Sequence, residues 1–392
     1  MKKNWEIKKL GDICDFFAGY TPKQNELSDL GDIPYFKVSD MNRDGNELFM
    51  SETELYAVSP KKIIPKDSIV FPKNGGAVFT NKKRILSQDS VIDLNSEGLF
   101  HKDYIDVMFL YYFLQLIDLK DYSKGAALPT IDMTALKNVS INVPPLEEQK
   151  RIVKILDEKF EQLESLKTNA QINLQNTKDL FQSQLAKAFS NTTWEKKRLG
   201  DVCEIITGPF GSSIHKTDYV PNGVPMINPQ SIVDGNIIPL EKCLVSENAA
   251  KNLERFKFIE NDIVIARRGE MGRCAVIRKE NENWLCGTGS FIIRSDSRKV
   301  NPDFLQTVLS SKESKQKLEK ESIGATMSNL NQGILGNFEI PLPPLPEQKR
   351  IVEELDTLSE KVRQLQEIYT KQIANCDELK QSYLQKAFEG EL

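Results

Sequence analysis

Metal-binding residue types are scarce in this sequence of 392 residues. It contains two histidines, His101 and His215, and none of its six cysteines belongs to a Cys-x-x-Cys pair. A zinc site needs several Cys or His ligands at short, regular spacings, so we expect no metal site in this chain. Cys14 and Cys203 stand in apolar, strand-like runs and are interpreted as small buried side chains.

Long apolar runs and phosphate-binding loops are also absent. The longest apolar run, residues 107–117, includes tyrosines and a glutamine, whereas a membrane helix needs about 20 apolar residues. The first residues, MKKNWEIKK, lack the apolar stretch of a signal peptide, so we expect a cytoplasmic protein without membrane contact. No G-x-x-x-x-G-K-[ST] motif is present, which argues against ATP binding by this chain.

The chain as a whole has no excess of positive charge. Its formal net charge of −4 argues against a uniformly basic nucleic-acid-binding protein and leaves that role to local basic patches. Its length exceeds the roughly 100 to 200 residues that are usual for one domain. We therefore expect two globular domains and an additional elongated part.

The feature that the sequence does contain is a tandem repeat. WEIKKLGDIC (residues 5–14) returns as WEKKRLGDVC (residues 194–203), a shift of 189 residues (194 − 5). VPPLEEQKRIVKILDE (residues 143–158) returns as LPPLPEQKRIVEELDT (residues 342–357), a shift of 199 (342 − 143). QSQLAKAFS, which begins at residue 182, returns as QSYLQKAFEGEL at the C-terminus, again shifted by 199. The chain is a duplication whose framing segments repeat while the intervening segments differ.

A long helix is predicted after each repeated Pro-Pro. The sequence changes there to Glu, Lys, Gln and Leu, and the proline and acidic residues at the start are typical of a helix N-terminus. Apolar residues then recur at spacings of three and four, which predicts a coiled-coil seam. The seam residues are Ile152, Leu156, Leu163, Leu166, Ala170 and Leu180 in the first helix, and Ile351, Leu355, Leu358, Val362, Leu365, Tyr369, Cys376, Leu379 and Tyr383 in the second.

The predicted fold class is α+β, with two mixed α/β domains and a pair of long antiparallel coiled-coil helices in a pseudo-twofold arrangement. The predicted segments are a first domain at 1–145, a first helix at 146–190, a second domain at 191–342 and a second helix at 343–392. Each helix has one apolar stripe, so its duplicate is the natural partner. The same symmetry predicts that the C-terminal AFEGEL lies beside residues 5–14, which would make the chain ends adjacent.

A basic, glycine-containing segment follows the equivalent strand-like run in each repeat. Clustered cations bind phosphates, Arg and Lys donate to base edges, and glycine allows close approach of a backbone, so both segments are candidate DNA contacts. The alternative is an ordinary solvated turn. The candidates are Lys73, Asn74, Lys82, Lys83 and Arg84 in the first repeat, and Arg267, Arg268, Arg273, Arg278 and Lys279 in the second.

Two polar loops also differ between the repeats, AGYTPKQNEL at residues 18–27 and TGPFGSSIHKTD at residues 207–218. Their hydroxyls and amides, together with Lys23, His215 and Lys216, are groups that can hydrogen-bond to base edges. Ordinary turn chemistry explains the same composition nearly as well.

Enzymatic motifs are incomplete. CGTGSF at residues 286–291 has few glycines for an S-adenosylmethionine loop, and Val-Pro-Pro-Leu at residues 143–146 lacks the Asn and the aromatic residue of adenine methyltransferases. The Glu-Gln-Lys triplets resemble part of a nuclease site, but they stand at the starts of long helices, where helix electrostatics explains them better. We expect no catalytic residues in this chain.

The order of domain, PPLxEQKRIV helix, domain, PPLPEQKRIV helix and LQKAFEGEL ending resembles the specificity subunit of type I restriction-modification systems over essentially the whole chain. The resemblance implies a non-catalytic subunit whose two domains each read one half of a split, asymmetric double-stranded DNA site. It also implies two methyltransferase subunits that bind S-adenosylmethionine, and restriction motor subunits that use ATP and Mg²⁺. This chain itself would hold no cofactor.

By this resemblance the basic segments contact DNA and the helices dock the methyltransferase, with Ile152, Leu156, Leu163, Ile351, Leu355 and Val362 as partner-binding residues. Helices of roughly 40 residues span about 60 Å, which predicts half-sites about one to two DNA turns apart. The competing interpretation is a tandem coiled-coil adaptor without DNA function. DNA binding through phosphates weakens steeply with salt, whereas apolar adaptor contacts do not.

Overall fold

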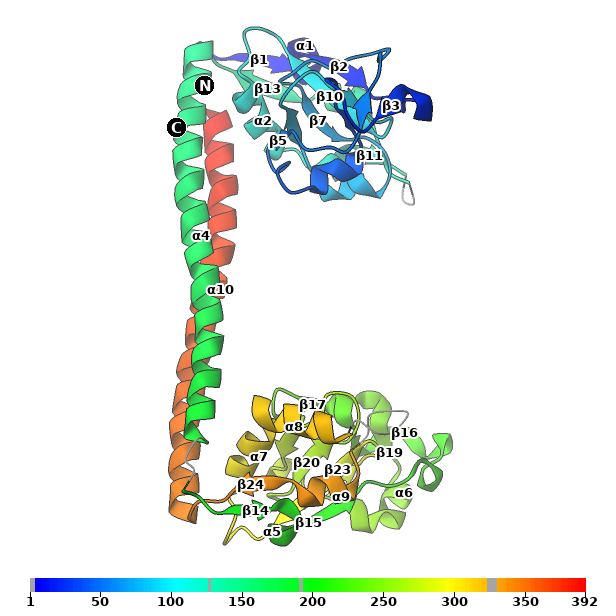
Figure 1. Ribbon diagram of the computed structural model, residues 1–392, viewed down its shortest axis with the longest axis vertical. Coiled ribbons are helices and arrows are strands. Elements are labelled where there is room, and N and C mark those ends of the chain that lie inside the picture. Colours follow the sequence, from blue (N-terminus) through cyan, green and yellow to red (C-terminus); the bar gives the residue numbers. More distant parts are fainter. Residues whose placement is uncertain (1–3, 126–127, 190–192, 323–329) are drawn as a thin grey trace. The chain divides into compact units, whose positions relative to one another are not determined.

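The computed structural model describes residues 4–125, 128–189, 193–322 and 330–392. It divides into two compact units, the first formed by Met1–Gln171 with Thr370–Leu392 and the second by Ile172–Tyr369. Each unit holds one mixed α/β domain and part of each of two long helices, α4 (Leu146–Ala188) and α10 (Leu345–Glu389) (Figure 1). The units therefore cut across the four predicted segments, whose boundaries stay a prediction.

The domain of the first unit is built around a five-stranded sheet with the strand order β2-β10-β7-β8-β5. β10 is antiparallel to both of its neighbours, and helix α2 contributes Phe109, Leu110 and Phe113 to the core that covers one face. These elements are β2 (Cys14–Ala18), β5 (Phe49–Met50), β7 (Ile69–Pro72), β8 (Arg84–Leu86), β10 (Ser96–His101) and α2 (Val107–Gln115). The shorter elements are β1 (Glu6–Lys9), α1 (Leu10–Ile13), β3 (Leu27–Ser28), β4 (Tyr35–Phe36), β6 (Tyr56–Ala57), β9 (Val91–Ile92), β11 (Ser123–Lys124), β12 (Thr130–Ile131), α3 (Met133–Lys137) and β13 (Ser140–Val143).

The domain of the second unit repeats this plan with a four-stranded sheet in the order β15-β23-β20-β21. Helix α7 takes the place of α2 and contributes Phe304, Leu305 and Val308 to the core. These elements are β15 (Cys203–Thr207), β20 (Ile263–Ala266), β21 (Cys274–Val276), β23 (Ser290–Ser295) and α7 (Pro302–Ser310). The remaining elements are β14 (Lys196–Arg198), α5 (Leu199–Val202), β16 (Tyr219–Ile227), β17 (Ile232–Val233), β18 (Asn236–Ile237), β19 (Leu244–Val245), α6 (Glu247–Asn252), β22 (Leu285–Cys286), α8 (Lys312–Ser322), α9 (Gln332–Asn337) and β24 (Glu339–Pro341).

In each unit the two long helices pack against each other in antiparallel directions. Leu156 shares the core of the first unit with Leu384, and Leu185 shares the core of the second unit with Leu355. The Nζ of Lys167 forms an ion pair of 2.7 Å with the Oδ1 of Asp377 in the first unit. The α+β fold with paired antiparallel helices, predicted from the repeat, is thereby confirmed.

One seam position in every seven is buried in the long helices. The buried residues are Leu156, Leu163, Ala170 and Thr177 in α4, and Leu355, Val362 and Cys376 in α10. The two sets correspond through the shift of 199 residues (355 − 156) that relates the repeats. Two turns of an α-helix cover about seven residues, so residues spaced by seven lie on the same side of the helix. Buried residues along one line of helix–helix contact therefore recur every seven positions.

Four leucines of the predicted seam are exposed, which corrects part of the sequence interpretation. Leu166, Leu180, Leu365 and Leu379 have exposed fractions of 48%, 45%, 37% and 47%. The spacing of three and four describes a stripe wider than the narrow line along which two helices touch, so one edge of the stripe faces outward.

The end of α10 lies against the first domain. The Nδ2 of Asn142 donates to the carbonyl of Phe388 at 2.9 Å, and an Nη2 of Arg151 donates to the carbonyl of Leu392 at 2.8 Å. Trp5 and Leu392 pack against the same core. The predicted position of AFEGEL beside the segment that begins at Trp5 is confirmed.

Candidate DNA interface

In the first domain, the polar loop and the basic loop leave the sheet on either side of one strand. Directly after β2, the N–H of Gly19 donates to the carbonyl of Ser96 at 3.2 Å. Directly after β7, the N–H of Lys73 donates to the carbonyl of Asn95 at 2.7 Å. The loop that contains Lys23 and the loop that begins at Lys73 therefore both start beside the first residues of β10.

The second domain repeats this arrangement around β23. The N–H of Gly208 donates to the carbonyl of Ser290 at 3.0 Å, and the N–H of Arg267 donates to the carbonyl of Gly289 at 2.9 Å. The loop that carries His215 and the loop that begins at Arg267 thus leave the sheet at the equivalent edge. The duplication brings a polar loop and a basic loop, whose residues differ between the repeats, to one end of each sheet.

We call residues 73–76 and 267–270 the glycine loops. Gly75 and Gly269 have φ of +77° and +78°, in the left-handed region that glycine adopts without strain. A Cβ added at either position would meet nothing within 4 Å, so both glycines border open space. The matching conformations show that the two loops share one backbone design, and their open sides could be approached by a nucleic-acid backbone.

The first cation of each glycine loop contacts the equivalent residue of the neighbouring strand. In the first domain the Nζ of Lys73 lies 3.0 Å from the Oε2 of Glu97, and the two side chains are 24% and 7% exposed. In the second domain the guanidinium of Arg267 lies 5.3 Å from the ring centre of Phe291, a cation–π geometry. Burial lowers the pKa of Arg267, with a further contribution from Arg268.

Glu97 and Phe291 were missed by the sequence interpretation. Each is the second residue of its strand, β10 or β23, and each is buried. The signal that could have found Glu97 is the alignment of the repeats, which sets a carboxylate against an aromatic residue at equivalent strand positions.

Several predicted DNA contacts are exposed in the structure. The side chain of Asn74 is half-buried and lies next to Lys73. Lys23, His215, Lys216, Arg268 and Lys279 are exposed. Their contact with DNA stays a proposal, which the exposure permits.

Lys83 cannot contact DNA from its position in the structure, and its assignment is corrected. It is 1% exposed, and its Nζ donates to the Oδ1 of Asn81 and to the carbonyl of Ile117, both at 2.7 Å. Burial lowers the pKa of Lys83 to about 8. The equivalent residue of the second domain is the buried Cys274, so this is a core position that holds a lysine in one repeat.

Arg84 and Lys82 each form a hydrogen bond within the domain. Arg84 pairs with Val70 in the sheet and donates through its Nη2 to the carbonyl of Met41 at 3.2 Å, and burial lowers its pKa. The Nζ of Lys82 donates to the Oδ1 of Asn42. Both side chains contact the segment at residues 37–55, which we call the braced loop. Arg84 is thereby withdrawn from the set of DNA contacts, whereas the contact of the half-buried Lys82 with DNA stays a proposal.

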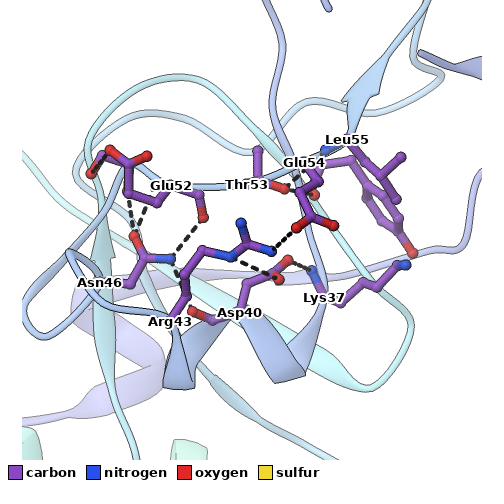
Figure 2. Close-up of polar contacts among 10 residues, drawn as sticks. Lys37, Asp40, Arg43, Asn46, Glu52, Thr53, Glu54 and Leu55 are labelled. Atoms are coloured by element: carbon purple, nitrogen blue, oxygen red, sulfur yellow. Dashed lines mark hydrogen bonds and ion pairs between the residues drawn. The ribbon is translucent and has the colours of Figure 1, made fainter. Parts of the chain in front are cut away.

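Figure 2 shows the internal contacts of the braced loop. An Nη2 of Arg43 lies 3.0 Å from the Oε1 of Glu54, and the N–H of Lys37 donates to the Oδ2 of Asp40 at 2.8 Å. The buried Asn46 donates through its Nδ2 to the carbonyls of Asp40 and Glu52 at 2.9 and 2.8 Å. These bonds fix a long loop that lacks regular secondary structure over most of its length.

Arg273 and Arg278 are also held by neighbouring side chains. An Nη2 of Arg273 lies 2.8 Å from Glu270, and an Nη2 of Arg278 lies 2.5 Å from Asp303. Because a carboxylate neutralises each guanidinium, these two arginines are weaker candidates for phosphate contact than the exposed Arg268.

The predicted partner-binding residues are buried. Ile152, Leu156, Leu163, Ile351, Leu355 and Val362 have exposed fractions between 0 and 8%, and they belong to the domain cores or to the seam between the long helices. A partner could reach them only if the helices separated. Their role is to hold the helices, which corrects the assignment.

The residues that the structure describes offer no group of three or more His, Cys, Asp or Glu side chains that could hold a metal ion. A membrane-spanning helix is likewise not found in the described part of the chain.

The family model of the type I restriction modification DNA specificity domain matches residues 2–174 and 191–373. The chain belongs to this family. The MjaVIII specificity subunit of Methanocaldococcus jannaschii is 27% identical, over 91% of this chain and 86% of that protein, and the EcoBI specificity subunit of Escherichia coli is 22% identical, over 99% and 86%. The HsdS subunit from Thermoanaerobacter tengcongensis shares the fold, with a TM-score of 0.65 and 23% identity over 100% of this chain and 98% of that chain. A chain from a type I R-M system structure reaches a TM-score of 0.79 at 23% identity, over 99% and 98%.

Proposed function

We propose that this chain is the non-catalytic, sequence-specific DNA-binding subunit of a type I restriction-modification enzyme, in which each domain reads one half of a bipartite, asymmetric site. The observation that carries the proposal is the shared sheet edge: both domains present a polar loop and a glycine loop there, and the side chains of these loops differ. Two sheets of the same design that carry loops of different sequence fit two half-sites of different base sequence.

The chain works with partner subunits in this proposal. Methyltransferase subunits would supply S-adenosylmethionine and modify adenine, and restriction motor subunits would use ATP and Mg²⁺. Family membership supports these assignments. The absence of a phosphate-loop motif from the sequence agrees with the use of ATP by a separate subunit.

The exposed leucines of the long helices are the proposed docking surface for the methyltransferase. The duplication relates Leu166 to Leu365 (365 − 166 = 199) and Leu180 to Leu379 (379 − 180 = 199). The first unit therefore holds Leu166 and Leu379, and the second holds Leu180 and Leu365. Equivalent apolar patches in both units fit two copies of one partner, because exposed leucines at regular helical spacing gain free energy when a partner helix covers them.

A charge placed in one patch tests this docking. Leu166→Asp should lower the amount of methyltransferase that copurifies with the chain, because docking would bury an unpaired carboxylate. Thr168→Asp adds the same charge two residues away on the other side of the helix and should have no effect. Unchanged copurification of the Leu166→Asp variant would remove this face from the interface.

Adenine-methylation mapping at base resolution tests the proposed function directly. Cells that express the chain with its methyltransferase should show a split, asymmetric motif that disappears when the chain is omitted. No new motif, with a bound and active methyltransferase, would favour the tandem coiled-coil adaptor.

Arg268→Ala should weaken binding to one half-site by roughly 1 to 3 kcal/mol if the arginine makes a bidentate base contact. Arg298→Ala is the matched control, because Arg298 is exposed beyond the opposite end of β23.

A further inference from the structure

A buried ion pair stands in the first domain where the second domain has an aromatic residue. The Glu97 side chain is 7% exposed and is paired with Lys73 at 3.0 Å. Removing a carboxylate from water costs free energy that one ion pair rarely recovers in full. At the same place in β23 the duplicate has Phe291, which is fully buried in the apolar core. The sheet therefore tolerates an apolar residue at this position, so the carboxylate is not needed for the sheet to form.

The ion pair lies where the glycine loop begins. Lys73 is the first residue after β7 and stands two residues before Gly75. Its backbone is fixed on both sides: its N–H donates to the carbonyl of Asn95 at 2.7 Å, and its carbonyl accepts from the N–H of Ile131 at 2.9 Å. A lysine ammonium has three N–H donors, of which Glu97 accepts one. The side chain of Lys73 keeps 24% of its exposure, so part of this paired lysine can still be reached from solvent.

We propose that Glu97 is a specificity-determining positioning residue of the first domain, which holds the Lys73 ammonium and cancels its charge so that Lys73 reads a base edge rather than a phosphate. The proposal rests on the proposed DNA-binding function. Attraction to phosphate depends on net charge and carries no sequence information, and the paired ammonium has little net charge to offer. Its hydrogen-bond donors remain, and they suit an acceptor in the major groove, such as N7 or O6 of a purine or O4 of thymine.

A double-mutant cycle on the assembled complex with the methyltransferase tests this role. The complexes carry the wild-type chain, Lys73→Met, Glu97→Gln, or both changes. Fluorescence anisotropy measures binding to a duplex with the mapped motif and to duplexes substituted in either half-site, at several salt concentrations. Glu97→Gln should lower the preference for the intact duplex on the order of ten-fold for one half-site only. It should also steepen the slope of log K against log salt by about one, because a released ammonium would gain a phosphate contact.

Two results separate positioning from a structural role. Glu97→Gln should have no further effect on base preference once Lys73 is methionine, because it acts through that lysine. Asp15→Asn is the matched control: Asp15, in β2, pairs with Lys102, which follows the opposite end of β10, and its loss should leave the base preference unchanged. If Glu97→Gln lowers the thermal midpoint of the first unit, Glu97→Phe, which carries the residue of the second domain, replaces it in the cycle.

Equal weakening of all duplexes by Glu97→Gln with an unchanged salt slope would overturn the inference, as would additive effects of the two single changes. A wild-type complex that shows no preference for the intact duplex would instead overturn the proposed function on which the inference rests.

Discussion

The side-chain oxygen of Gln149 accepts a hydrogen bond from the backbone N–H of Asp106 at 2.8 Å, which ties the start of α4 to the start of α2. The amide nitrogen of Gln149 donates to the carbonyls of Tyr104 and Pro144 at 3.0 and 2.8 Å. The Gln149 side chain is fully buried, so each of these groups would lose its partner if the amide were removed.

The second repeat makes the same joint with Gln348. Its oxygen accepts from the N–H of Asn301 at 2.7 Å, and its nitrogen donates to the carbonyls of Lys299 and Pro343 at 3.0 and 2.8 Å. The glutamine in the repeated Glu-Gln-Lys triplet thus fastens each long helix to its domain. Helix electrostatics accounts for the neighbouring acids, but it does not account for this buried amide.

Replacing Gln149 with leucine should destabilise the first unit by about 3 kcal/mol, because the change leaves buried donors and acceptors without partners. The measurement is urea unfolding of a chain in which Trp194 and Trp284 are phenylalanine, so that Trp5 alone reports on the first unit. Gln162→Leu, at an exposed position of the same helix, should stay within about 0.5 kcal/mol. Equal effects of the two changes would contradict the role of the buried amide.

The buried and exposed leucines of α4 should respond very differently to truncation. Leu156→Ala should cost about 2 to 5 kcal/mol in the same assay, because it opens a cavity in the core that Leu156 shares with Leu384. Leu166→Ala should cost less than about 0.5 kcal/mol, because the side chain is nearly half exposed. Similar costs at both positions would mean that the seam is wider than one residue per heptad.

The pH dependence of stability should reveal the buried lysine. Burial lowers the pKa of Lys83 to about 8 from 10.5, so the folded chain gives up this proton near pH 8 while the unfolded chain keeps it until about 10.5. The unfolded state then binds more protons in this window, and Lys83 makes the free energy of unfolding rise with pH between about 8 and 10.5. Lys83→Met should lack this rise.

The test compares the wild type with Lys83→Met at pH 7.5, 9 and 10, so that the contributions of all other groups cancel. A constant difference between the two chains across this range would show that the lysine titrates as an exposed one does.

Thiol reactivity should separate Cys243 from the buried cysteines. Burial raises the pKa of Cys14 and of Cys203 to about 12 and that of Cys274 to about 11, so few thiolates form there at pH 8. Cys243 is partly exposed and should be alkylated first by iodoacetamide, as followed by peptide mass spectrometry. All six cysteines should react in urea; modification of Cys14 as fast as Cys243 without urea would contradict the burial.

The glycine loop offers a matched pair of backbone substitutions. Gly75→Ala should destabilise the first unit by about 1 kcal/mol, because φ at Gly75 is +77° and an alanine is strained there. Gly76→Ala should be nearly neutral, because φ at Gly76 lies outside that region and nothing stands within 4 Å of the added Cβ. Identical effects would mean that the loop adopts another conformation.

The repeat was sufficient to predict the architecture, because framing segments that recur in order leave few ways to assemble them. The helix starts at Leu146 and Leu345 follow from the prolines and acids, and α2 begins at Val107 because Asp106 accepts from the N–H groups of Met108 and Phe109. These signals are local, so they can be read without knowledge of the rest of the fold.

The burial of individual cations was not predictable from local composition. Lys83 and Arg84 lie in a basic run, but the backbone carbonyls that accept their hydrogen bonds belong to Ile117 and Met41, which are distant in the sequence. A signal was nevertheless present: when the repeats are aligned, the apolar Cys274 and Ala275 stand opposite these cations.

The left-handed glycines and matching backbone hydrogen bonds of the two loops make the duplication an internal set of natural substitutions. Glu97 and Phe291, or Lys83 and Cys274, are alternative side chains on one backbone. If the two residues of such a pair are exchanged, each moves to a backbone conformation that matches its own in the other domain. The two halves of this chain are therefore reciprocal controls, in which the chemistry of a side chain can be measured while the local backbone stays the same.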